Sequence, residues 1–457
     1  MEYKKLDERV FGIHSRNSWF VMNTFPFVAY QIEDVDSFEA LYEFYCSEMK
    51  GTDLIPFSDD YNFKGFFAME WIMTTDCNLN CPHCFAHVKG ENGRYGLGKQ
   101  PLSKEDLIDG IDKACKLFKD DIVNNELVDA EFQLFIIGGE PLMEFDNMVY
   151  AIEYLEKQLV EIENSTQLNT LRRNYFIATN GLLIDDRIAN YLSKGPFTVS
   201  VSIDTPINPI KLDEHKSRKT DIAIKGAKKL LNNGMKKVII NCVIPANKVY
   251  ELDAIMDYIE SFGIMDQISG VQISPQTPPT RQTKFSGCES NSIVTSDWSK
   301  DLDRCRFFAK KLIEYCDKYN TDMKKYHMRI KSMVSSGGMG YRCPVGQWKW
   351  CLTPGGEIYP CHQFVGIEKY KMGNVHEEMQ EFLKNGKEVF QLFKDRTVFK
   401  VKPCDECPLQ SCCCVFIDCP GRALLEGGDM YKIPEHQCLM AKEYLLTILE
   451  QILWGEA

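Results

Sequence analysis

Six short apolar runs that alternate with longer amphipathic segments restrict the fold of this chain more than any other feature. The runs begin at residue 68 and read AMEWIMTT, EFQLFIIGG, NYFIATNG, FTVSVSID, KVIINCVIP and GVQISPQ. Between them lie segments of helical periodicity, such as SKEDLIDGIDKACKLFKD and AIKGAKKLLNNG. Alternating strands and helices predict parallel strands with the helices outside. Six units, rather than eight, predict an α/β fold: an open or partial (β/α)6 barrel.

The regions around this barrel differ in composition. Residues 1–66 combine β-like stretches with one amphipathic helix, VDSFEALYEFYCSEM, and predict a small cap or part of a peptide-recognition segment. The barrel domain is predicted for 67–325. The cysteine- and glycine-rich segment 335–440 is too irregular for a large apolar core. Residues 441–457 predict a closing C-terminal helix that packs back onto the body.

Charge and cysteine content limit the possible partners. The formal charge of -12 argues against general nucleic-acid binding, which needs a basic face. No apolar run approaches the ~20 residues of a membrane span, and the N-terminus lacks the apolar core of a signal peptide. We therefore expect a cytoplasmic protein without a membrane partner. In that reducing compartment 19 cysteines favour metal sites, because they cluster at 77–84, 343–361 and 404–438.

The first cysteine cluster, CNLNCPHCF, directly follows the first predicted strand and contains Cys77, Cys81 and Cys84. Parallel barrels place their chemistry at the carboxyl ends of the strands. A cubane iron–sulfur cluster normally uses four thiolates, so three leave one iron open to an exchangeable ligand such as an amino acid's amine and carboxylate. The alternative is a tetrahedral zinc site completed by His87.

The CxxxCxxC loop resembles that of the radical S-adenosylmethionine (SAM) superfamily. The resemblance implies that SAM binds the open iron of a [4Fe–4S] cluster and is cleaved by one electron. The resulting 5′-deoxyadenosyl radical abstracts hydrogen from the substrate. The motifs GGEPL, TNG and SID end the next three strands, and their order disfavours zinc. By resemblance, the candidate cofactor-binding residues are Gly138, Gly139, Glu140, Pro141, Thr179, Asn180, Ser202 and, after DEHKS, Arg218.

The C-terminal cysteines resemble the SPASM extension of radical SAM enzymes that modify peptides. The turn PGGEIYPC predicts a β-hairpin with a left-handed glycine, Gly356. The resemblance implies two auxiliary [4Fe–4S] clusters, the first held by Cys343, Cys351, Cys361 and Cys419, the second by Cys404, Cys407, Cys413 and Cys438. The run Cys412–Cys414 leaves open whether Cys412 or Cys414 takes the place of Cys413. Structural zinc is again the alternative.

The resemblance implies a peptide substrate and an electron donor of the flavodoxin or ferredoxin type. Sulfatase-maturing enzymes, which form formylglycine, share this layout but carry a base, an aspartate, directly after the third auxiliary cysteine. Here that position is His362, a candidate catalytic base because imidazole titrates near neutral pH.

The stretch MEWIMTTDCNLNCPHCFAHV resembles maturases of Cys-xxx-repeat precursor peptides, the thioether-forming ranthipeptide group. We therefore expect a maturase of a ribosomally made, cysteine-rich precursor peptide that links cysteine sulfur to carbon, as in ranthipeptides and sactipeptides. The alternatives are a sulfatase-maturing enzyme, an alcohol dehydrogenase of this type, a carbon–carbon cross-linking enzyme, and a non-catalytic zinc or iron–sulfur scaffold.

Overall fold

In the computed structural model the chain forms two compact units. The barrel unit comprises residues 62–296 and 344–395, and the terminal unit comprises 1–61, 297–343 and 396–457. The structure describes residues 2–7, 10–24, 27–50, 64–79, 81, 84, 86, 95–204, 214–244, 246–275, 302–319, 345, 349–394, 396, 400–409, 419–435, 438, 439, 442, 443, 445 and 446. Within these residues no helix has the length and apolarity needed to cross a membrane.

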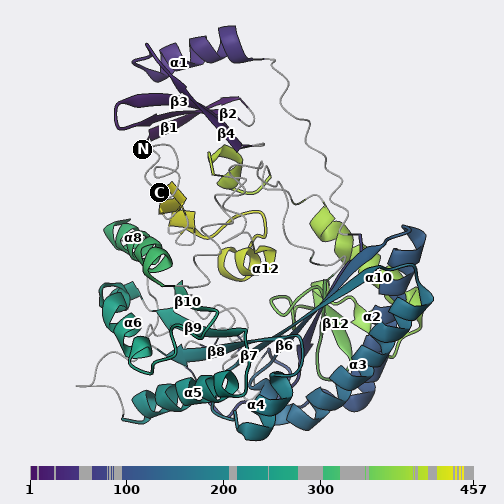
Figure 1. The fold of residues 1–457 in the computed structure, drawn as a ribbon. Helices are drawn as coiled ribbons and strands as arrows, with labels where there is room; N and C mark the ends of the chain where they lie inside the picture. The colour runs from purple at the N-terminus through teal and green to yellow at the C-terminus, as the bar shows by residue number, and fades with distance from the viewer. Residues whose placement is uncertain are drawn as a thin grey trace. The chain divides into compact units, whose positions relative to one another are not determined.

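Six parallel strands form the centre of the barrel unit, and each pairs with the next along the chain (Figure 1). They are β5 (Phe66–Ile72), β6 (Asp129–Ile137), β7 (Thr170–Thr179), β8 (Phe197–Asp204), β9 (Val238–Ile244) and β10 (Gly270–Pro275). All six predicted apolar runs coincide with these strands. The predicted parallel α/β fold is therefore confirmed.

Helices follow the strands and cover the outer face of the sheet (Figure 1). They are α2 (Lys104–Asn124), α3 (Phe145–Ser165), α4 (Asp186–Leu192), α5 (Glu214–Asn232) and α6 (Leu252–Glu260), with short helices η2 (Pro141–Glu144) and η3 (Ala246–Glu251). Strand β6 shows both faces: Phe132 and Leu134 are fully buried on the helix side, whereas Gln133 and Phe135 are only partly buried. We call the face that carries Gln133 and Phe135 the inner face.

A hairpin from the C-terminal part of the chain extends this sheet beyond β5. It consists of β11 (Lys349–Leu352), β12 (Glu357–Tyr359) and β13 (Gly373–Asn374). The short helix η5 (Glu368–Tyr370) lies between β12 and β13, and helix α10 (Met379–Lys394) follows β13. Strand β11 pairs with β5 in parallel, with Cys351 in register with Glu70. Gly356 has φ +78°, which confirms the predicted left-handed turn.

His376, which follows β13, contacts two carboxylates in the first two turns of α2. Its Nε2 lies 2.9 Å from Asp106 Oδ1 and its Nδ1 lies 2.8 Å from Asp109 Oδ2. Asp106 also belongs to the capping box of α2, together with Ser103. The carboxylate of Asp109 first, and that of Asp106 with it, outweigh partial burial and raise the pKa of His376.

The terminal unit contains an antiparallel sheet of β1 (Glu2–Asp7), β2 (Val10–Ser15), β3 (Ser18–Thr24) and β4 (Phe27–Ile32) in that order. The predicted helix is present as α1 (Phe38–Phe44), extended by η1 (Tyr45–Met49). Leu41 packs on Leu6, Val10 and Val21 in one small core. The other described elements are α8 (Leu302–Lys318), η6 (Cys404–Glu406), α12 (Pro420–Arg422) and η7 (Ala423–Gly427).

The predicted C-terminal helix at 441–457 lies largely outside the described residues. Residues of the predicted 335–440 segment belong to both units. The boundaries drawn from the sequence at 66, 325, 335 and 440 stay predictions.

Candidate functional site

The carboxyl ends of β5 and β6 are joined backbone to backbone. The N–H of Gly139 donates to the carbonyl of Thr74 at 2.7 Å, and the N–H of Glu140 donates to that of Asp76 at 2.9 Å. A Cβ on Gly138 would lie 2.5 Å from the Thr74 oxygen, and one on Gly139 only 1.9 Å from the Asp76 oxygen. The two glycines are thus needed for close approach to the loop that carries Cys77.

Glu140 connects this junction to the end of β7. Its side chain is fully buried. Oε1 accepts hydrogen bonds from the Thr179 hydroxyl at 2.7 Å and the Leu142 N–H at 3.1 Å, and Oε2 accepts from the Asn180 N–H at 2.7 Å. Burial raises the pKa of Glu140 above its usual value, against the lowering effect of these donors. The GGEP and TNG motifs, predicted as separate contacts, therefore form one structure.

The three-cysteine loop lies against the same junction. Cys77 Sγ accepts the N–H of Leu79 at 3.4 Å and the side-chain amide of Asn180 at 3.8 Å. The Cys84 N–H donates to the Cys81 carbonyl at 3.2 Å, and all three cysteines are partly exposed. The sulfur of Cys77, which receives N–H donors beside the two close-packed glycines, suits a ligand of an iron–sulfur cluster. His87, the alternative zinc ligand, lies outside the described residues.

Two polar side chains occupy neighbouring register positions on the inner face, one near the end of β8 and one in the middle of β9. Ser202, predicted from its motif, is in register with Asn241. Asn241 Oδ1 is buried and has no hydrogen-bond partner among the described residues. Sequence reasoning missed Asn241, although a single amide inside the apolar run VIINCVI was the available signal. Arg218 lies on α5, and its side chain is outside the described part of the chain.

A second polar cluster surrounds the hairpin cysteines. Glu70, on the inner face of β5, accepts the Lys349 ammonium at 2.7 Å and the His362 N–H at 2.6 Å, and lies 3.0 Å from His362 Nδ1. Cys351 is completely buried next to Glu70 and close to Cys361. Burial first, then Glu70 and Cys361, raise the pKa of Cys351. Sequence reasoning missed Glu70, whose signal was a single carboxylate within AMEWIM.

The remaining candidate cysteines lie in the terminal unit or outside the described residues. The CxxC pair forms a tight turn, in which the Cys407 N–H donates to the Cys404 carbonyl at 3.1 Å. Burial first, and Cys438 in addition, raise the pKa of Cys407 to about 11. Cys419 caps α12, because its Sγ accepts the N–H of Arg422 at 3.5 Å. The candidates that the structure does not describe are Cys343, Cys412, Cys413 and Cys414.

The described residues contain no three His, Cys, Asp or Glu side chains close enough together to hold a metal ion as they stand. Both predicted auxiliary ligand sets include an undescribed cysteine, and Cys419 lies in a different unit from Cys351 and Cys361. The two auxiliary sets therefore stay predictions.

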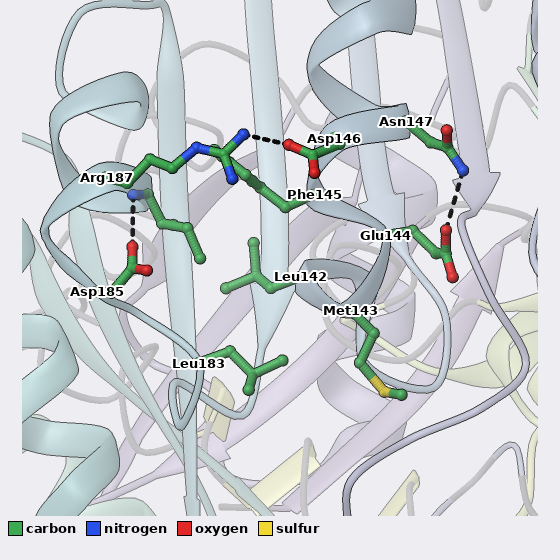
Figure 2. Close-up of a pocket in the computed structure, with 10 residues that line it drawn as sticks. Leu142, Met143, Glu144, Phe145, Asp146, Asn147, Leu183, Asp185 and Arg187 are labelled. Atoms are coloured by element: carbon green, nitrogen blue, oxygen red, sulfur yellow. Dashed lines mark hydrogen bonds and ion pairs between the residues drawn. The ribbon is translucent and has the colours of Figure 1, made fainter.

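A surface pocket of about 420 Å³ lies beside the GGEP and TNG motifs, between η2, the start of α3 and the start of α4 (Figure 2). Its polar side chains pair with one another: Arg187 forms an ion pair with Asp146, and the Asn147 amide donates to the Glu144 carboxylate at 3.0 Å. Asp185 caps α4 by accepting the Ile188 N–H at 2.8 Å. The polar groups that line this pocket therefore serve to cap and join the first turns of these helices, and we assign the pocket no ligand.

Comparison with known proteins gives the same assignment as the motifs. Residues 71–259 match the model of the Radical SAM superfamily. The cysteine-type anaerobic sulfatase-maturating enzyme of Clostridium perfringens (strain 13 / Type A) is 23% identical over 345 residues, 73% of this chain and 84% of that protein. The radical SAM cyclopropyl synthase TigE of Paramaledivibacter caminithermalis is 24% identical over 206 residues, 44% of this chain and 40% of that protein.

Among solved structures, the one described as native anSMEcpe with bound AdoMet superimposes with a TM-score of 0.57 at 17% identity. The match covers 85% of this chain and 98% of that one, and shows the shared fold. The superfamily implies a [4Fe–4S] cluster and SAM, for which the joined ends of β5, β6 and β7 are suited. Residues 71–259 are thus a radical SAM domain, in a chain homologous to the anaerobic sulfatase-maturating enzymes.

Proposed function

We propose that this chain is a radical SAM maturase of a ribosomally made, cysteine-rich precursor peptide, and that it joins a cysteine sulfur to a carbon of another residue. The main support is the position of β5. Its carboxyl end leads into the loop of Cys77, Cys81 and Cys84, and its neighbour β11 carries Cys351. One strand thus links the cofactor loop to candidate ligands of a second cluster.

The proposed cofactor site uses the residues at the strand ends. Cys77, Cys81 and Cys84 would hold the [4Fe–4S] cluster, which with SAM supplies the 5′-deoxyadenosyl radical on one-electron reduction. The segment Gly138–Pro141 would face the methionyl amine, with Thr179 and Asn180 beside it. Ser202 and Arg218 are proposed contacts of the ribose or carboxylate. A flavodoxin- or ferredoxin-type protein is the proposed electron donor.

The proposed auxiliary sets are Cys343, Cys351, Cys361 and Cys419, and Cys404, Cys407, Cys438 and one of Cys412, Cys413 or Cys414. Clusters there would supply a ligand position for the peptide thiolate and a path for the surplus electron. In the net reaction the acceptor carbon loses a hydrogen atom, which ends in 5′-deoxyadenosine, and the thiol loses a proton. The surplus electron then leaves the site.

A second candidate function is the oxidation of a cysteine or serine side chain to formylglycine. It is favoured by the relatives, which include the cysteine-type enzyme above and a serine-type anaerobic sulfatase-maturating enzyme of Bacteroides thetaiotaomicron, 23% identical over 354 residues. A solved structure of that group is described with AdoMet and the Cp18Cys peptide. Against it stands His362, in the position where the resembled enzymes carry an aspartate base.

Mass spectrometry of a cysteine-rich precursor co-expressed with the protein separates these functions. A thioether removes two hydrogens per link and protects the cysteine from alkylation. Formylglycine made from cysteine exchanges sulfur for oxygen with loss of two hydrogens, and leaves an aldehyde that reacts with hydrazides. A carbon–carbon link removes two hydrogens but leaves the thiols free. An unchanged mass with the partner peptide contradicts all three.

A separate test distinguishes an enzyme from a scaffold. Anaerobically reconstituted protein should be brown and, when reduced, should release 5′-deoxyadenosine from SAM. Replacing Cys77, Cys81 and Cys84 by alanine should abolish that release and spare the auxiliary iron. Colourless protein with stoichiometric zinc would instead support a scaffold.

A further inference from the structure

Three uncharged polar side chains form a line across the inner face of the barrel unit. Ser202, Asn241 and Gln272 lie on β8, β9 and β10, which are neighbours in the sheet (Figure 1). Ser202 is in register with Asn241, and Asn241 is in register with Gln272. Neighbouring strands lie about 4.8 Å apart, so one small ligand can contact adjacent members of the line. We call these three residues the polar row.

Asn241 is the residue of the polar row that most needs an explanation. It interrupts the apolar strand VIINCVI, and its chain neighbours Ile240 and Cys242 are fully buried on the opposite face. Its Oδ1 is buried and has no hydrogen-bond partner in the part of the chain that the structure describes. A buried oxygen without a donor costs free energy that an apolar side chain of similar shape would not. The stability of β9 therefore does not account for an amide here.

Gln272 brings a complete carboxamide to the end of the row. Its chain neighbours Val271 and Ile273 are buried on the opposite face, whereas Gln272 stays partly exposed on the inner face. A carboxamide offers one acceptor oxygen and one donor nitrogen side by side. This pair of groups matches the N6 amino group and the N7 nitrogen of adenine.

The polar row continues the cofactor junction at the end of β7. Thr179 is in register with Val201, so the next residue, Asn180, comes level with Ser202. The side-chain amide of Asn180 lies 3.8 Å from Cys77 Sγ. The line from β7 to β10 thus begins beside the three-cysteine loop and extends over three strand spacings, about 14 Å. A ligand whose amino-acid end lies at the cluster would place its other end on this line.

We propose that the polar row binds the nucleoside end of SAM. Oδ1 of Asn241 accepts a hydrogen bond from a ribose hydroxyl, and the carboxamide of Gln272 pairs with the N6/N7 edge of the adenine. Both residues then determine specificity for a cofactor with an intact ribose and an adenine base. The inference rests on the cofactor part of the proposed function and is independent of which peptide product is formed.

Calorimetric titration of the anaerobically reconstituted full-length protein tests the proposal without any variant. The probes are S-adenosylhomocysteine, its 2′-deoxy and 3′-deoxy forms, and S-inosylhomocysteine, which lacks the N6 amino group. We expect S-inosylhomocysteine to bind at least about fivefold more weakly than the adenosine compound, and one deoxy form at least about threefold more weakly. Equal affinity for all four compounds overturns the proposal alone. No binding of any compound overturns it together with the cofactor assignment.

Four variants assign the discrimination to single residues. Asn241→Leu and Gln272→Met remove the amides at similar size, and should abolish the preference for the ribose hydroxyl and for adenine, respectively. Asn174→Leu and Gln133→Met are the matched controls, because their amides lie on the same face but donate to Glu131, at 3.0 and 2.6 Å. Both controls should discriminate as the wild type does. A preference that survives in its own variant, or that is lost equally in the controls, overturns the proposal.

The stability of the ligand-free protein separates a binding role from a structural one. Asn241→Leu replaces an unpaired buried oxygen by an apolar group, so its midpoint of unfolding in urea should equal or exceed that of the wild type. A lower midpoint would show that the amide supports β9 itself, and would overturn its assignment to a ligand.

Discussion

Adding a single methyl group at Gly139 should separate the two strand ends on which the cofactor site is built. The new Cβ would lie 1.9 Å from the Asp76 carbonyl oxygen, whereas real Cβ atoms essentially never come closer than 3.0 Å to such an atom. The backbone around Asp76 must therefore retreat by about 1.1 Å. In the wild type the Asp76 carbonyl accepts the Glu140 N–H at 2.9 Å, and the displacement would break this hydrogen bond. The adjacent residue, Cys77, would be displaced as well.

The displacement sets the expected size of the effect. A misplacement of about 1 Å at a reacting site can cost about 100-fold in rate. Gly139→Ala should accordingly slow the reductive cleavage of SAM by about that factor, measured as 5′-deoxyadenosine released per bound cluster under anaerobic conditions. The overpacking should also cost about 1–3 kcal/mol of folding free energy.

Gly386→Ala is the matched control. Gly386 lies on α10, and a Cβ there would be 3.5 Å from its nearest neighbour, an ordinary contact. The variant should cleave SAM at the wild-type rate and, because alanine favours helix, should not be less stable. If Gly139→Ala cleaves SAM within about threefold of the wild type at equal cluster content, the argument from close approach is refuted.

Two further predictions concern the polar contacts of the barrel unit. Glu140→Ala leaves the buried hydroxyl of Thr179 and the N–H of Asn180 without their acceptor, so the free energy of unfolding in urea should fall by at least about 2 kcal/mol; an unchanged midpoint would contradict the bridging role of Glu140. For His376 the raised pKa means that its ion pairs with α2 contribute stability fully below the ordinary value of 6.5 and lose it as pH rises through the higher folded-state value. Urea midpoints of wild type and His376→Gln should therefore differ most in mild acid and converge in alkali, and a gap that widens with pH would show the opposite sign.

The apolar strands were predictable because their signal is local. Each run of β5 to β10 is continuous, bounded by polar or glycine residues, and followed by a helical period. The hairpin was predictable only as a turn. Its parallel pairing with β5 joins Cys351 to a partner far back in the sequence, and no local pattern encodes such a pairing. Helix α4 has only 7 residues, too few to show a clear helical period in the sequence.

The residues of the candidate site also fall into two groups, those marked by a local motif and those that depend on contacts between distant residues. The cysteine loop and the GGEP and TNG motifs were found because each is a compact string at a strand end. The hydrogen bonds by which Glu140 links the GGEP motif to Thr179 and Asn180 could be seen only in the structure. Glu70 and His362 are 292 residues apart, and Glu70 resembles an isolated polar residue in an apolar run. A buried charge whose partner is remote in sequence gives no sign of what compensates it.

The parallel pairing of β11 with β5 has a consequence for any attempt to divide the protein. A fragment that ended near residue 296 would contain all six parallel strands but would lack β11. The backbone N–H and C=O groups on one edge of β5 would then have no pairing strand, and this edge strand is apolar. An unpaired strand edge of that kind can pair with a strand of another molecule, which leads to aggregation of the protein. The minimal autonomous form of this radical SAM domain must therefore carry residues 349–374 along, either covalently or as a separately supplied peptide.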